Sequence, residues 1–71
     1  MTYADRIRSI VPASEPRHVE AWMRSEHGTL DHLSPEQFVL EAQVAADLAA
    51  IDPAMSEALA QSFGLTARKA A

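Results

Sequence analysis

Hydrophobic residues recur along the chain at the spacing of helices, and no stretch alternates as a strand does. Near the N-terminus, four of them fall at positions i, i+4, i+7 and i+8, which form one stripe of a helix over residues 3–11. These residues are Tyr3, Ile7, Ile10 and Val11. Thr2 can cap this helix, and Pro12 ends it because the residue before a proline avoids the helical region.

A second helix is predicted to begin at Ser14, which is a good N-cap, and to close at Gly28. Its apolar face includes Trp22, which we assign to the core. The segment that follows, with the sequence TLDHL, carries Leu30 and Leu33. We expect both leucines to insert into the core as anchors.

The clearest start signal is SPEQ at residues 34–37, where Ser34 caps a helix and Pro35 occupies its first position. The third helix then runs to about Ile51 and is apolar on two faces. One face has Phe38, Ala42, Ala45 and Ala49, and the other has Leu40, Val44, Leu48 and Ile51. Because such a helix must be covered by neighbours on several sides, we predict that it is the central element.

A fourth helix is predicted to begin at Asp52 and Pro53, with an apolar stripe of Met55, Leu59 and Phe63. The chain is therefore expected to form a small all-α domain of four helices: a short N-terminal helix and three longer ones. We expect this single domain to span residues 1–65 and the C-terminal residues 66–71 to be frayed.

The sequence ALAQSFGLTARKAA, at residues 58–71, permits two interpretations. In a DNA-binding helix-turn-helix, Gly64 would make the turn and the next helix would enter the major groove. In a Schellman cap, Gly64 adopts a left-handed conformation and Leu65 folds back onto the helix. Residues 66–71 make fewer than two helical turns and hold only two basic side chains. The pattern therefore favours a cap, and a DNA-binding regulator is the minor alternative.

Composition and charge narrow the choice of partners. The chain has 71 residues, which limits the size of its core, and no cysteine that could form a disulfide. Its formal net charge is −4, and the segment from Asp31 to Leu65 holds six acids without any lysine or arginine. Acidic surfaces repel phosphate backbones, so we expect no nucleic-acid partner and favour basic or apolar partners.

The same features bear on localisation. No apolar run approaches the roughly 20 residues that cross a membrane, and residues 1–10 carry too many charges for a secretory signal. We therefore expect a soluble cytoplasmic protein without a membrane partner.

Residues that could support chemistry are few. Glutamate, aspartate and histidine side chains gather around the glycine turn, but their spacing matches no helical H-x-x-x-H pattern for zinc. They are Glu26, His27, Asp31, His32 and, on the preceding helix, His18. We interpret them as turn and helix-end residues and expect no metal or cofactor. A core this small leaves little room for the desolvated cleft that acid–base catalysis requires, so we do not expect an enzyme.

Three segments carry a resemblance: WMRSEHGTLDHL at residues 22–33, LSPEQF at 33–38 and LAQSFGL at 59–65. Over residues 18–65 the chain resembles a group of short, uncharacterised all-α bacterial proteins. These have a tryptophan-containing helix, a T-L-x-x-L linker and an S-[FY]-G-L ending. The group has no assigned activity, so the resemblance transfers no functional residue. Small proteins of this kind are common on phages and plasmids, which makes an inhibitor of a host protein an alternative function.

These observations predict a non-enzymatic protein–protein interaction module that forms a homodimer. Four short helices cannot cover both apolar faces of the third helix and also the stripe of the first, so an apolar surface should remain. The interface candidates are Tyr3, Ile7, Ile10, Leu40, Val44 and Leu48. The alternative is a small acidic inhibitor or adaptor that docks on a heterologous protein through Glu36, Glu41, Asp47 and Glu57.

Overall fold

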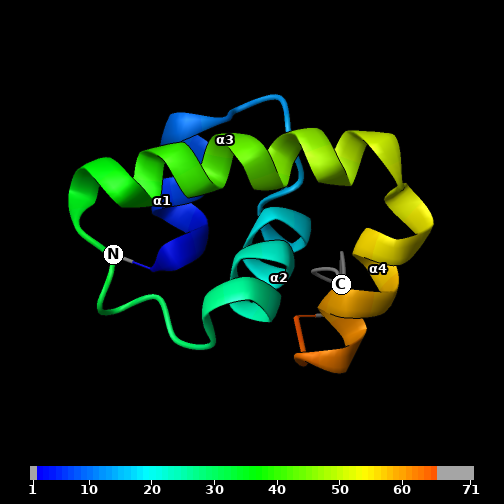
Figure 1. Cartoon of the computed structure of the whole chain (residues 1–71). Coiled ribbons are helices and arrows are strands. Elements are labelled where there is room, and N and C mark those ends of the chain that lie inside the picture. The colour runs from blue at the N-terminus through cyan, green and yellow to red at the C-terminus, as the bar shows by residue number, and fades with distance from the viewer. Residues whose placement is uncertain (1, 66–71) are drawn as a thin grey trace.

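The computed structural model describes residues 2–65, which form four helices and no strand (Figure 1). The helices are α1 (Tyr3–Ile10), α2 (Pro16–His27), α3 (Pro35–Ile51) and α4 (Pro53–Ser62). The predicted all-α, four-helix fold is confirmed. None of these helices is both long and apolar enough to cross a bilayer. Residues 66–71, for which we predicted a frayed tail, lie outside the described part of the chain.

The starts of α3 and α4 follow the pattern expected of a capping residue and a proline. The Ser34 hydroxyl accepts a hydrogen bond from the backbone N–H of Gln37 at 3.2 Å. The Asp52 carboxylate accepts one from the backbone N–H of Met55 at 3.1 Å. The proline that follows each cap has no N–H to leave unsatisfied, so it begins the helix without cost.

The starts of α1 and α2 differ in one respect from the prediction. Thr2 and Asp5 form the capping box expected for α1. The N-cap of α2 is Glu15 rather than Ser14, and its side chain makes no capping hydrogen bond. The reason is that Pro16 occupies the first helical position, so the residue just before it becomes the cap.

Gly64 ends α4 in a Schellman motif, as one of the two interpretations of this segment predicted. Its φ angle is 76°, in the left-handed region that glycine adopts without strain. The N–H of Leu65 donates to the carbonyl of Ala60 at 2.6 Å, and the N–H of Gly64 donates to that of Gln61 at 3.0 Å. The glycine thus caps α4, whereas the residues of a following DNA-recognition helix lie outside the described range.

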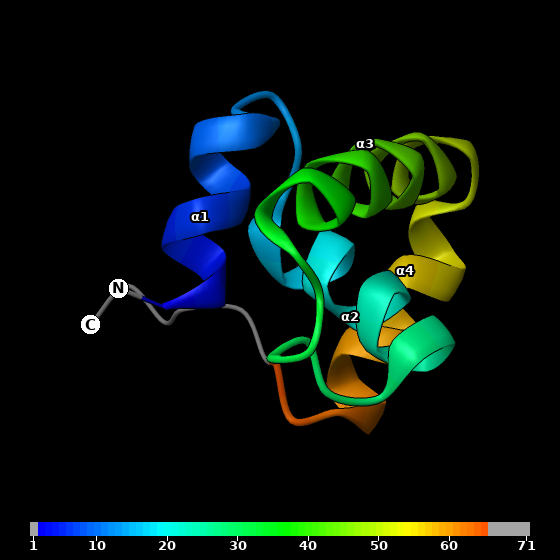
Figure 2. The ribbon, with the colours of Figure 1, turned by 60° about the vertical axis from the view of Figure 1, so that its left-hand side comes forward.

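The core forms where α2 and α3 meet α1 and the segment between α2 and α3. Figures 1 and 2 show α3 lying across the other helices, and α2 packs against all three of its neighbours. Leu30 and Leu33 are buried, as expected of anchors. The buried cluster consists of Ile7, Val19, Met23, Leu30, Leu33, Phe38, Ala42, Ala45 and Ala46.

Helix α3 contacts each of the other three helices, as expected of the central element, but they cover it on one side only. Its face of Phe38, Ala42, Ala45 and Ala49 is buried, but the opposite face is exposed. The other helices all contact α3 from its buried side, and α2 has the more enclosed position between them (Figure 1). Three short helices do not have enough surface to cover a 17-residue helix all round.

Helix α4 packs against α2, and its buried residues within the described range, Ser56 and Ala60, are both small. The Trp22 indole N–H donates to the Ser56 hydroxyl at 2.7 Å. That hydroxyl in turn donates to the Asp52 carbonyl at 2.9 Å. The Ser56 hydroxyl therefore accepts one hydrogen bond and donates another. This explains why a polar side chain is tolerated at a fully buried position.

Replacing Ser56 with alanine should therefore destabilise the fold by about 1–3 kcal/mol, because the indole N–H would lose its acceptor in a partly buried site. The free energy of unfolding can be measured by urea denaturation. Trp22 is the single tryptophan, so its fluorescence reports directly on this contact. The matched control is Ser62→Ala, at an exposed position of the same helix. Equal stabilities of the two variants would contradict the role given to Ser56.

An ion pair reinforces the same junction. The Arg17 guanidinium of α2 donates two hydrogen bonds to the Glu57 carboxylate of α4, one of them at 2.8 Å. His18 Nε2 lies 3.2 Å from the same carboxylate. The hydrogen bonds from Arg17, and then the one from His18, lower the pKa of Glu57 to about 2.

Because the folded-state pKa of Glu57 is depressed, its stabilising effect is present above its ordinary pKa of 4.5 and is lost as pH falls toward about 2. Glu57→Gln should therefore lower the free energy of unfolding at pH 7, and the difference from wild type should shrink between pH 4.5 and pH 2. Urea denaturation across this range tests the prediction. Glu26→Gln, at an exposed position of α2, is the control, and a pH-independent difference for Glu57→Gln would refute the assignment.

Candidate interaction surface

The outward side of α3 carries a row of four large apolar side chains, which we call the α3 stripe. It consists of Leu40, Val44, Leu48 and Ile51, which are 63%, 56%, 38% and 78% exposed, respectively. Their spacing of four, four and three residues keeps them on one side of the helix. Three of the four were among the interface candidates, and the structure places all three at the surface.

The candidates on α1 lie elsewhere. Ile7 is 0% exposed and belongs to the core, and Ile10 packs against that core. The Tyr3 ring stacks on Phe38 with centroids 6.2 Å apart, and its hydroxyl donates a hydrogen bond to Asp31. The proposal that α1 is free to dock on a partner is therefore corrected. Residues 11–15 turn the chain back so that α1 uses its stripe to complete the domain's own core.

Sequence reasoning missed other exposed apolar residues. Ile51 was placed on the correct face but was left out of the interface candidates, although it is the most exposed member of the stripe. Met55 on α4 and Phe63 at its C-cap, two members of the apolar stripe predicted for this helix, are also exposed. Helix α4 instead faces α2 through Ser56 and Ala60, which are small enough to allow close approach. The many alanines of this helix indicate that it can approach a neighbour closely, but the periodicity of its apolar residues points to the Met55–Phe63 face instead.

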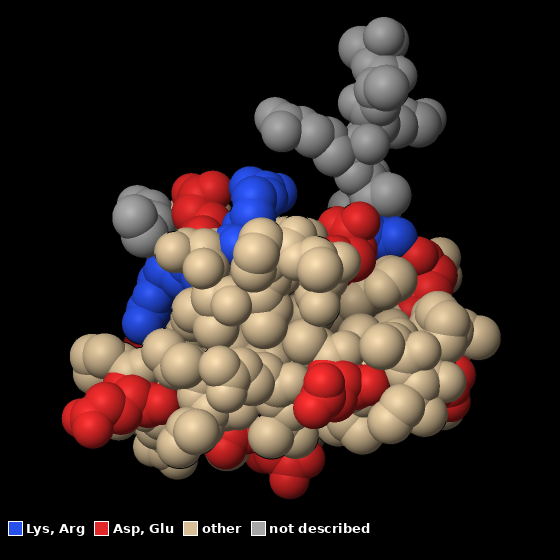
Figure 3. Space-filling view, turned by 90° about the horizontal axis from the view of Figure 1, so that it is seen from above, with Lys and Arg blue, Asp and Glu red and all other residues tan. Residues whose placement is uncertain are grey.

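The surroundings of the α3 stripe are acidic. Glu36 and Asp47 are exposed on the same helix, and Asp52 follows at its end. Figure 3 shows a broad area of uncharged side chains on this face, with acidic groups along several of its edges and basic groups beside some of them. Gln43 and Asp47 lie one turn apart along one edge of the stripe, and Glu41 lies on the other edge. The surface is thus apolar along its middle and polar at both edges.

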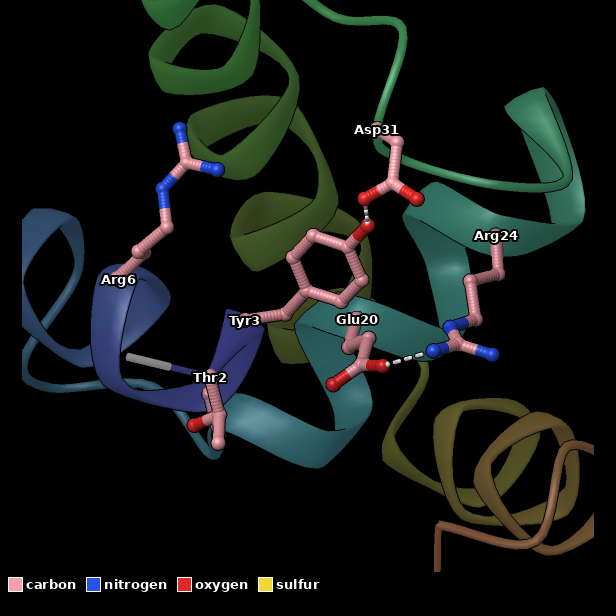
Figure 4. Close-up of a pocket in the computed structure, with 7 residues that line it drawn as sticks. Thr2, Tyr3, Arg6, Glu20, Arg24 and Asp31 are labelled. Atoms are coloured by element: carbon pink, nitrogen blue, oxygen red, sulfur yellow. Dashed lines mark hydrogen bonds and ion pairs between the residues drawn. The ribbon is translucent and has the colours of Figure 1, made fainter.

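A polar hollow of about 610 Å³ lies between α1, α2 and the segment that joins α2 to α3 (Figure 4). Four of its lining side chains are already paired with one another. Glu20 accepts from Arg24 at 2.8 Å, and Tyr3 donates to Asp31, a hydrogen bond that raises the pKa of the Tyr3 hydroxyl. Arg6 lies over the Phe38 ring rather than pointing into the hollow. The first contact lies within α2, and the second joins α1 to the segment between α2 and α3.

The histidines and acids considered as metal ligands are dispersed. His27 Nε2 lies 2.9 Å from Glu41 Oε1, without the alignment of a hydrogen bond, whereas His18 contacts Glu57 on α4. The rings of His27 and His32 are 6.2 Å apart. Within residues 2–65, the structure brings together no group of three or more potential metal ligands.

Comparisons with protein-family models, curated proteins and solved structures found no match to this chain. The resemblance to short bacterial proteins therefore stays a prediction from the sequence.

The two groups of interface candidates should respond differently to truncation. Ile7→Ala should lower the free energy of unfolding by about 2–5 kcal/mol, because it leaves a cavity in the core. Leu40→Ala should have an effect within about 0.5 kcal/mol, because that side chain is mostly in water. Thermal and urea denaturation at submicromolar protein concentration provides the comparison without a contribution from association. Similar losses for both variants would mean that α1 and α3 are not packed as described.

Proposed function

We propose that this protein is a non-enzymatic protein–protein interaction module that self-associates into a homodimer through the α3 stripe. The observation that carries the proposal is the exposure of four large apolar side chains along one helix. Full burial of such a side chain is favourable by roughly 1.5–3 kcal/mol. Continuous apolar patches on soluble domains commonly mark interaction sites.

The size of the surface supports a reversible dimer rather than a permanent one. Helix α3 has 17 residues and is therefore about 25 Å long. One helix face of this length supplies less area than the roughly 800 Å² per partner of a standard protein interface. We therefore expect association in the micromolar range, with the fraction of dimer rising with concentration.

A second candidate is supported by charge. The margins of the stripe are acidic, and the segment from Asp31 to Leu65 contains no lysine or arginine. An apolar strip with acidic edges suits a heterologous partner that presents apolar and basic residues, as an adaptor or inhibitor of a host protein would require. That function predicts a stable monomer in isolation and formation of a complex that weakens as salt is added.

Sedimentation equilibrium from about 1 to 500 µM distinguishes the two, because self-association produces a mass above the 7.7 kDa of one chain. Val44→Glu should shift the protein to the monomer by placing a charge in the middle of the stripe. Ala58→Glu introduces the same charge at an exposed position of α4 and should leave the dimer intact. A single-chain mass for the wild type at every concentration would eliminate the homodimer and favour the adaptor.

A further inference from the structure

We infer that the two copies pair with their α3 helices antiparallel, about a twofold axis at the level of Ala45 and Ala46. This inference rests on the proposed self-association and specifies its geometry. It follows from the order of apolar and polar side chains on the exposed side of α3.

The apolar positions are nearly symmetric about that level. Leu40 precedes Ala45 by five positions, and Ile51 follows Ala46 by five. These are also the two most exposed members of the stripe. When a second copy is reversed, Leu40 lies opposite Ile51 of that copy, and Val44 lies beside its Leu48. Each large side chain thus meets one from the other copy, as an isologous interface requires.

The polar edges also match in this orientation. The twofold axis runs perpendicular to both antiparallel helices. Each edge of the stripe in one copy therefore lies beside the same edge in the other copy. The Gln43 amide of one copy then lies next to the Asp47 carboxylate of the other, to which it can donate a hydrogen bond. The symmetry produces this contact twice. In a parallel pair, Asp47 would instead face the Leu48 edge of the second copy, where it has no donor.

The spacing of the stripe argues against a parallel coiled coil. Such a structure requires apolar residues at alternating intervals of three and four over several heptads. The α3 stripe has intervals of four, four and three, and the chain turns away at Asp52. Antiparallel helices also place their dipoles in opposite directions, which is the more favourable arrangement for adjacent helices.

Distances between spin labels test the orientation. The chain has no cysteine, so Glu36→Cys and Ala50→Cys each accept one label per copy at an exposed position. In the antiparallel dimer the two labels at position 36 should be about 30 Å apart, and those at position 50 about 15 Å, given the rise of 1.5 Å per residue. Short and similar distances at both positions would overturn the antiparallel arrangement while leaving the dimer in place. A monomeric mass with no dipolar coupling would overturn self-association itself.

A charge substitution provides an independent test. Gln43→Lys should tighten the dimer about two- to tenfold, because each lysine would face Asp47 of the other copy. Gln37→Lys makes the same charge change at an exposed position near the start of α3, ten residues before Asp47, and is the matched control. The lysine at position 37 lowers the net negative charge of the surface by the same amount, but it lies too far from Asp47 of the other copy to form an ion pair with it. Equal dissociation constants for the two variants would contradict the pairing of Gln43 with Asp47.

Discussion

The packing of one face of α3 against α1 and α2 is the constraint on which the rest of the structure depends. Phe38 enters the core beneath Tyr3, and alanines along the same face allow α2 to approach closely. Once this face is buried, the opposite face must point outward, because side chains on a helix project around its whole circumference. The exposure of Leu40 and Val44 is therefore a direct consequence of how the core is built.

The composition of the core explains why other contacts are polar. Several buried positions of α3 and α4 are alanine or serine, which bring helices together but bury little apolar area. At the α2–α4 junction, hydrogen bonds from Trp22 to Ser56 and from Arg17 to Glu57 supply the missing specificity. The hydrogen bond from Tyr3 to Asp31 likewise joins α1 to the segment between α2 and α3. The polar contacts between Trp22 and Ser56 and between Arg17 and Glu57 thus hold α4 against α2, whereas the α3 stripe has no partner within the described part of the chain.

Much of the fold was predictable because its signals are local. Ser34 and Asp52, each followed by proline, specify helix starts through contacts within four residues, and Gly64 specifies a helix end in the same way. The assignment of α1 to an interface failed for the opposite reason. Nothing in the periodicity of Tyr3, Ile7 and Ile10 distinguishes a stripe that meets the same chain from one that meets another chain. Only the path of the chain after Pro12 decides between them.

By itself, the sequence determined the number of helices, their approximate limits and the presence of more apolar helical surface than a chain of this length can cover. Those properties depend on residues close together along the chain and on total composition. The tertiary structure alone decided which apolar surface stays exposed. Helix α1 closed over the core, α4 approached α2 through Ser56 and Ala60, and both choices left the α3 stripe in water. Such choices depend on competition among contacts between residues far apart in the sequence, and local patterns do not encode the outcome of that competition.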